Sequence, residues 1–130
     1  DFTVHQLGHE LSAMFGTAHG ASLSTVWDSW ARTVCHAKPA RFARYAKNVW
    51  GLSGSDENDL AAAGIQATRE YFTELGMPVS FGQNQDIGIQ AEEVLRDLAY
   101  RCSFQRSRSI GTFQVLNEED IYGIYQKANR

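Results

Sequence analysis

Histidine is the residue type whose spacing in this chain could support chemistry. Three of the four histidines, His5, His9 and His19, lie within fifteen residues of one another. If the first two lie on one helix, their interval of four residues places their Cβ atoms about 5–6 Å apart on one face. Gly16 predicts a turn after this helix, and an antiparallel return of the next helix would bring His19 back towards it. Because imidazole binds zinc, iron, copper and nickel, the three rings could converge on one ion.

The residues alone leave two interpretations of this cluster open: a metal or catalytic site, or a set of structural histidines. A zincin is excluded, because Ala13 occupies the place of the second histidine in the H-E-x-x-H motif that begins at His9. A glycine-rich phosphate-binding turn is also missing, since residues 51–54 precede a predicted helix but follow no strand. His36 stands apart from the other three and is interpreted as structural.

Helices must position these histidines, because apolar residues recur at intervals of three and four along nearly the whole chain. Only two prolines interrupt the pattern, which predicts an all-α domain of about six helices without a sheet. The expected helices cover about residues 4–15, 19–34, 39–50, 57–75 and 88–101, and a last one follows a cap at Asn117. Residues 79–87 and 102–116 are expected to be irregular. The side chains predicted to face inward include Phe42, Val49, Ile65, Leu75, Ala91 and Leu98.

Length and composition fit one domain over residues 1–130, and a hydrophobic content of 43% excludes disorder. The charges recur too often for a membrane span, and a formal charge of −3 predicts no affinity for nucleic acid or a membrane surface. Cys35 and Cys102 are isolated, as in the reduced thiols of a cytoplasmic protein. The chain begins at Asp1 without an initiator methionine or a signal-peptide pattern, so we expect it to be a segment of a longer polypeptide.

The order of the motifs around the histidines resembles that of a known enzyme family. The chain is similar to the iron-containing (group III) alcohol dehydrogenases, in particular to the butanol dehydrogenase and aldehyde reductase branch. The resemblance continues through residues 39–51, 72–78 and 110–122 and covers essentially the whole chain. Its signature is Asp1-Phe2-x-x-His5-x-x-x-His9-x-Leu11-Ser12-Ala13, followed by His19-Gly20.

This resemblance implies a fold and a set of site residues. In the family, an N-terminal α/β domain binds NAD(P), and an all-helical, dehydroquinate synthase-like C-terminal domain holds one divalent ion through an Asp and three His. The resemblance makes His5 and His19 two of these metal ligands, and His9 the non-ligand residue beside the metal and nicotinamide. The remaining Asp and His ligands and the NAD(P)-binding domain have no counterpart here. Phe2 replaces a usual Trp, which affects the pocket shape, and Asp28 replaces a frequent Pro, which removes a helix kink.

The implied function is that of the C-terminal portion of a metal-dependent NAD(P) alcohol dehydrogenase. The full enzyme would interconvert a small alcohol and its aldehyde by hydride transfer, as a homo-oligomer, by expectation a dimer. The ion, Fe²⁺ or Zn²⁺, would polarise the substrate oxygen, while His9 would pass the hydroxyl proton to solvent. Phe2 and Phe15 are expected either to line a dry pocket or to pack in the core. The 130-residue chain alone is expected to be inactive.

Two other functions remain open from the residues. One is a non-enzymatic helical interaction module with structural histidines, which predicts no specific metal. The other is a hydrolase that uses the same ion to activate water and needs no nucleotide.

Overall fold

Six α-helices and one short 3-10 helix account for the regular structure of the computed structural model, which describes residues 1–130. The prediction of an all-α domain is confirmed, because the only β-type pairing is a single bridge between Ile110 and Leu116. None of the helices has the length and hydropathy needed to cross a membrane. The elements are α1 (Thr3–Phe15), α2 (His19–Val34), η1 (Cys35–Ala37), α3 (Pro39–Trp50), α4 (Glu57–Glu74), α5 (Glu92–Cys102) and α6 (Glu118–Ala128).

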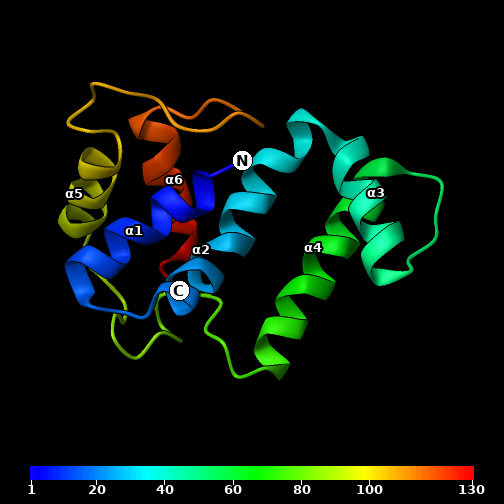
Figure 1. Cartoon of the computed structure of the whole chain (residues 1–130), viewed down its shortest axis with the longest axis horizontal. Helices are drawn as coiled ribbons and strands as arrows, with labels where there is room; N and C mark the ends of the chain where they lie inside the picture. The colour runs from blue at the N-terminus through cyan, green and yellow to red at the C-terminus, as the bar shows by residue number, and fades with distance from the viewer.

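Helix α2 divides the molecule into two parts (Figure 1). On one side lie α1, α5 and α6, and on the other lie α3 and α4. Buried apolar side chains from both sides form one large core that includes Leu7, Val26, Ile65, Leu98 and Ile124. A second, small cluster of Ala43, Ala46 and Leu60 lies between α3 and α4. Helix α2 is therefore the central helix, and it contacts α1, α4 and α6.

Local sequence signals explain most of the helix ends. Gly16 ends α1 in the left-handed conformation at φ 70°, where its N–H bonds to the carbonyl of Ser12. Pro39 occupies the first turn of α3, where its missing N–H costs no hydrogen bond. Asn117 and Asp120 form a reciprocal capping box at the start of α6, so the predicted cap is confirmed.

The start of the fifth helix was predicted four residues too early. Gly88 has φ 69°, which a right-handed helix does not allow, and α5 begins only at Glu92. Residue 90 is held outside the helix because its backbone pairs with the far end of the chain: the Gln90 N–H donates to Asn129 Oδ1 at 2.9 Å, and Asn129 Nδ2 donates to the Gln90 carbonyl at 3.0 Å. This tertiary pairing leaves no local signal in the sequence.

Three residues predicted to face inward lie on the surface instead. Val49 and Leu75 are 59% and 57% exposed, and Ala91 is exposed as well. Val49 and Leu75 lie at the ends of α3 and α4, where the helical pattern continues but no other helix covers it. Cys35 and Cys102 are buried and remain free thiols. The interpretation of them as unpaired is therefore confirmed.

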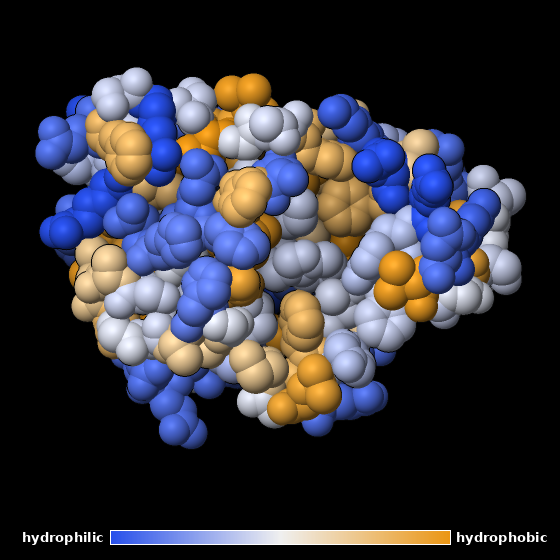
Figure 2. Space-filling model, viewed as in Figure 1, coloured by the Kyte–Doolittle hydropathy of each residue, from blue (hydrophilic) through white to orange (hydrophobic).

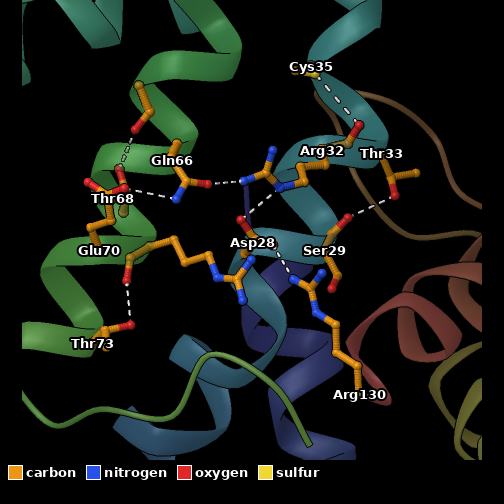
Figure 3. A network of polar contacts seen from close by, with 12 residues as sticks. Asp28, Ser29, Arg32, Thr33, Cys35, Gln66, Thr68, Glu70, Thr73 and Arg130 are labelled. Atoms are coloured by element: carbon orange, nitrogen blue, oxygen red, sulfur yellow. Dashed lines mark hydrogen bonds and ion pairs between the residues drawn. The ribbon is translucent and has the colours of Figure 1, made fainter.

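Asp28 has a larger structural role than the loss of a helix kink that was predicted for it. Helix α2 continues through this position, and the Asp28 side chain is only 1% exposed. Its carboxylate accepts a hydrogen bond from Arg32 Nε at 2.9 Å and another from Arg130 Nη2 at 2.8 Å (Figure 3). Arg32 also donates to Gln66 Oε1 of α4 at 2.8 Å. The buried carboxylate thus joins α2 to α4 and to the last residue of the chain.

Candidate metal and active site

A close crossing of α1 and α2 brings the histidine-bearing segments together. The crossing lies at Gly8, where a Cβ atom would come within 2.8 Å of Ser22 Oγ and 3.0 Å of a Leu23 methyl carbon. Ser22 Oγ in turn donates a hydrogen bond of 2.7 Å to the carbonyl of His19. A side chain at this position would press on the ends of the Ser22 and Leu23 side chains, so Gly8 allows the close approach of the helices that carry His5 and His19.

The structure brings all three predicted histidines into one cluster. The ring centroids of His5 and His19 are 5.4 Å apart, those of His9 and His19 are also 5.4 Å apart, and those of His5 and His9 are 6.3 Å apart. With metal–nitrogen bonds of about 2.0–2.1 Å, two imidazoles on one tetrahedral ion have centroids roughly 5 Å apart. Both pairs that include His19 match this spacing, whereas the pair of His5 and His9 is too wide.

Burial distinguishes His5 from His9. His5 is half-buried, whereas His9 and His19 are exposed. The Phe2 ring lies 5.4 Å from the His5 ring and is itself 73% exposed. His5 therefore has an apolar neighbour on one side, and His9 faces solvent, which suits a group that exchanges protons with water.

The histidine cluster does not by itself form a metal site. No group of three or more His, Cys, Asp or Glu side chains in the chain is placed so that it could hold a metal ion. Glu10, next to His9 in the sequence, has Arg101, Arg108 and Asp97, on or after α5, as charged neighbours in addition to His9. Burial raises the pKa of the Glu10 carboxyl, and the two arginines partly offset this effect. Pairs of these imidazoles, but no larger group, therefore have the spacing of ligands on one ion.

Asn84 fixes the turn between the two histidine-bearing helices, a role that no local sequence signal marks. It lies in the irregular segment after α4 and is 3% exposed. Its side-chain amide donates to Thr17 Oγ1 at 3.1 Å and to Thr25 Oγ1 at 3.0 Å. Thr17 belongs to the turn that precedes His19, and Thr25 lies on α2. A buried amide thereby links the turn, α2 and the segment that follows α4.

An apolar hollow of about 470 Å³ opens beside His5. Trp27 and Trp30 of α2 and Phe72 of α4 form its walls, together with Asp1 at the start of the chain. Neither Phe2 nor Phe15 lines it, so the prediction of these two as its walls is wrong. Phe2 projects towards solvent and Phe15 packs against the main core. Trp27 and Trp30 form the walls because they lie on the face of α2 that is turned towards α4.

A second group of titratable residues lies in the core away from the histidines. Burial raises the pKa of the Cys102 thiol to about 12, and the nearby Glu10 carboxylate adds to this shift. Burial also raises the pKa of Tyr125 well above its usual value, and the Tyr125 hydroxyl donates to the Leu7 carbonyl at 2.9 Å. Both groups remain protonated at neutral pH and serve the packing of α1, α5 and α6.

The fold and the site define an all-helical domain with an open imidazole cluster beside an apolar pocket. Residues 1–129 match the model of the "Fe-containing alcohol dehydrogenase family, C-terminal", and the chain belongs to this family. The resemblance found in the sequence is thus confirmed, as is the fold of the family's helical C-terminal part.

Individual relatives agree with the family assignment. The chain is 30% identical over 129 residues to NADH-dependent butanol dehydrogenase A of Clostridium acetobutylicum, a match that covers 98% of this chain and 32% of that protein. It is 32% identical over 94 residues to the NADPH-dependent aldehyde reductase YqhD of Escherichia coli, covering 72% of this chain and 24% of the reductase.

A solved structure shows the same arrangement of helices. The crystal structure of NADH-dependent butanol dehydrogenase A from Thermotoga maritima superimposes with a TM-score of 0.88 at 29% identity, over 100% of this chain and 33% of that one. The chain therefore spans about a third of the length of the relatives it matches.

Proposed function

We propose that this chain is the C-terminal, metal-binding portion of an NAD(P)-dependent alcohol dehydrogenase that interconverts small alcohols and aldehydes. The single observation that carries the proposal is the convergence of His5, His9 and His19 beside an apolar hollow. Family membership adds the reaction class. The full protein is proposed to act as a homo-oligomer, namely a dimer. The chain alone is proposed to be inactive, because the NAD(P) site and two of the four metal ligands of the family have no counterpart in it.

His5 and His19 are proposed to hold the divalent ion, Fe²⁺ or Zn²⁺. Their centroid distance of 5.4 Å is near that of two imidazoles on one tetrahedral ion. When bound, such an ion supplies Lewis-acid polarisation of the substrate oxygen. His5 also lines the hollow, so it joins the metal position to the space for the apolar part of the substrate.

His9 is proposed to transfer the hydroxyl proton. Its ring lies 5.4 Å from that of His19 and is exposed, so it can exchange a proton with solvent. Imidazole is the side chain that most often serves as a general acid and base in enzymes. The apolar walls formed by Trp27, Trp30 and Phe72 would disfavour water around a bound substrate, which protects a hydride-transfer reaction from competing chemistry.

The test measures NADH- and NADPH-dependent reduction of butyraldehyde by the full-length protein, stripped of metal and then supplied with Fe²⁺ or Zn²⁺. We expect His5→Ala and His19→Ala to abolish both metal retention and activity. His9→Ala should retain the metal and lower kcat by about 10²–10⁴-fold, the usual effect of losing a positioned proton-transfer group. His36→Ala is the matched control, because this exposed histidine lies on η1, outside the cluster.

The rival functions give different results in the same assay. An interaction module would show no metal-dependent turnover and no effect of His5→Ala. A hydrolase would act on its substrate without any nucleotide. Metal loss in His9→Ala together with metal retention in His19→Ala would show that the roles of these residues are assigned wrongly.

A further inference from the structure

The segment between α5 and α6 contains a closed loop over residues 110–116. Ile110 and Leu116 bond to each other in both directions, at 3.0 Å and 2.8 Å, and both are buried. Gly111 makes the first bend at φ 96°, where a Cβ atom would lie 2.4 Å from the Gln114 carbonyl oxygen. The loop therefore has a defined shape, although the sequence predicted only an irregular connection here.

A single carboxylate fastens this loop to the start of α1. Asp1 Oδ2 accepts hydrogen bonds from the backbone N–H groups of Thr112 at 2.9 Å and Phe113 at 2.6 Å. Asp1 Oδ1 accepts from the Thr3 N–H at 2.7 Å and from the Thr3 hydroxyl. Hydrogen bonds to a charged acceptor are about twice as strong as neutral ones. The loop position is thus coupled to the helix that carries His5.

The loop places one aromatic side chain at the edge of the pocket. Phe113 packs against Phe42 at 5.5 Å and Trp30 at 6.4 Å between ring centroids. With Trp27, Trp30 and Phe42 it lines a second hollow of about 270 Å³. Figure 2 shows hydrophobic side chains in this hollow, between the upper end of α2 and α3.

The two hollows adjoin at the tryptophans. Trp27 and Trp30 line both the hollow beside His5 and the hollow closed by Phe113. Asp1 lines the hollow beside His5, and its carboxylate accepts a hydrogen bond from the backbone N–H of Phe113, which lines the second hollow. Trp27 and Trp30 are thus walls common to both hollows, and an apolar chain lying along them from the first hollow would have Phe113 at its far end.

We infer that Phe113 is the specificity-determining wall for the apolar tail of the substrate and that Asp1 is the positioning residue that holds it. The inference rests on the proposed function and adds the substrate class: aldehydes whose apolar chain is longer than that of butyraldehyde. Each buried CH₂ group contributes about 0.8 kcal/mol, so contact with two of them favours a longer substrate by roughly tenfold.

The experiment compares kcat/KM for octanal and for butyraldehyde in the full-length protein. We expect Phe113→Ala to lower the octanal-to-butyraldehyde ratio of kcat/KM about tenfold, mainly by raising KM for octanal. Phe113→Tyr, which keeps an aromatic ring, should have the wild-type ratio. Asp1→Asn should lower the ratio in the same direction and speed hydrogen exchange at the amides of Thr112 and Phe113. Asp86→Asn is the matched control: Asp86 is an exposed aspartate, and it should keep the wild-type ratio.

Each alternative result identifies what has failed. In the first, the wild type reduces butyraldehyde while Phe113→Ala keeps the wild-type ratio of kcat/KM for octanal to kcat/KM for butyraldehyde. This result overturns the role of Phe113 as a specificity-determining wall and leaves the proposed function standing. An unchanged exchange rate in Asp1→Asn overturns the positioning role of Asp1. A wild type that reduces neither aldehyde overturns the proposed function, and the substrate assignment with it.

Discussion

Replacing Gly8 with alanine tests whether the crossing of α1 and α2 sets the histidine geometry. The new Cβ atom would lie 2.8 Å from Ser22 Oγ and 3.0 Å from Leu23. Either the helices separate by several tenths of an ångström or the Ser22 hydroxyl rotates and loses its bond to the His19 carbonyl. In both cases the change reaches the first turn of α2, where His19 lies.

The expected size follows from opposing terms. Alanine in place of glycine favours a helix by about 0.8–1.0 kcal/mol. Overpacking a buried contact costs about 1–3 kcal/mol, and a lost hydrogen bond about 0.5–1.5 kcal/mol. We therefore expect Gly8→Ala to lower the free energy of unfolding by up to about 2 kcal/mol. The affinity of the full-length protein for metal should fall about tenfold, as for other changes just outside a ligand shell.

The assay is urea unfolding followed by circular dichroism, with Gly123→Ala as the control. Gly123 lies within α6 and has no atom within 4 Å of the added Cβ, so its replacement should stabilise the protein by up to about 1 kcal/mol. The reasoning is refuted if Gly8→Ala is as stable as Gly123→Ala and binds metal as tightly as the wild type.

Three further predictions concern the core and the chain as a whole. Asp28→Asn should destabilise the protein by about 1–2 kcal/mol in urea unfolding, because it weakens the charged hydrogen bonds from Arg32 and Arg130, whose side chains are partly exposed. Equal unfolding midpoints of the variant and the wild type would contradict this. Because the Cys102 pKa is raised from 9.0 to about 12, an unfolded chain loses this proton before the folded one, so stability should decrease as pH rises through that interval. The free energy of unfolding should fall by at least about 1 kcal/mol between about pH 8 and about pH 10, and this decrease should be smaller in Cys102→Ala. Finally, the purified 130-residue chain should show no NAD(P)-dependent alcohol oxidation, and any measurable turnover would disprove this.

The sequence predicted the helices well because their signals are local. The glycine after α1, the proline at the start of α3 and the Asn117 cap each act within a few residues. The spacing of His5 and His9 likewise reflects one helix face. Prediction failed where a partner lies far along the chain, as for the late start of α5, which depends on Asn129.

The same reason explains what was missed in the site. Asn84 acts on Thr17, 67 residues away, and Asp28 binds Arg130, 102 residues away. The pocket walls depend on which face α2 turns to α4, and helical periodicity marks a face as apolar without naming the helix opposite it. Tryptophans 27 and 30 could therefore be read as core but not as walls of a hollow.

The hydrogen bond from Tyr125 to the carbonyl of Leu7 spans 118 residues of sequence and has a consequence for synthesis of the protein. A ribosome that adds roughly 5–20 residues per second needs roughly 6–24 s to pass from one partner to the other. During that time α1 can pair with α2 through the short turn, but its apolar face, with Leu7 and Leu11, has no α6 to cover it. Helices α1 and α2, which carry His5, His9 and His19, are thus made well before the helix α6 that completes their core.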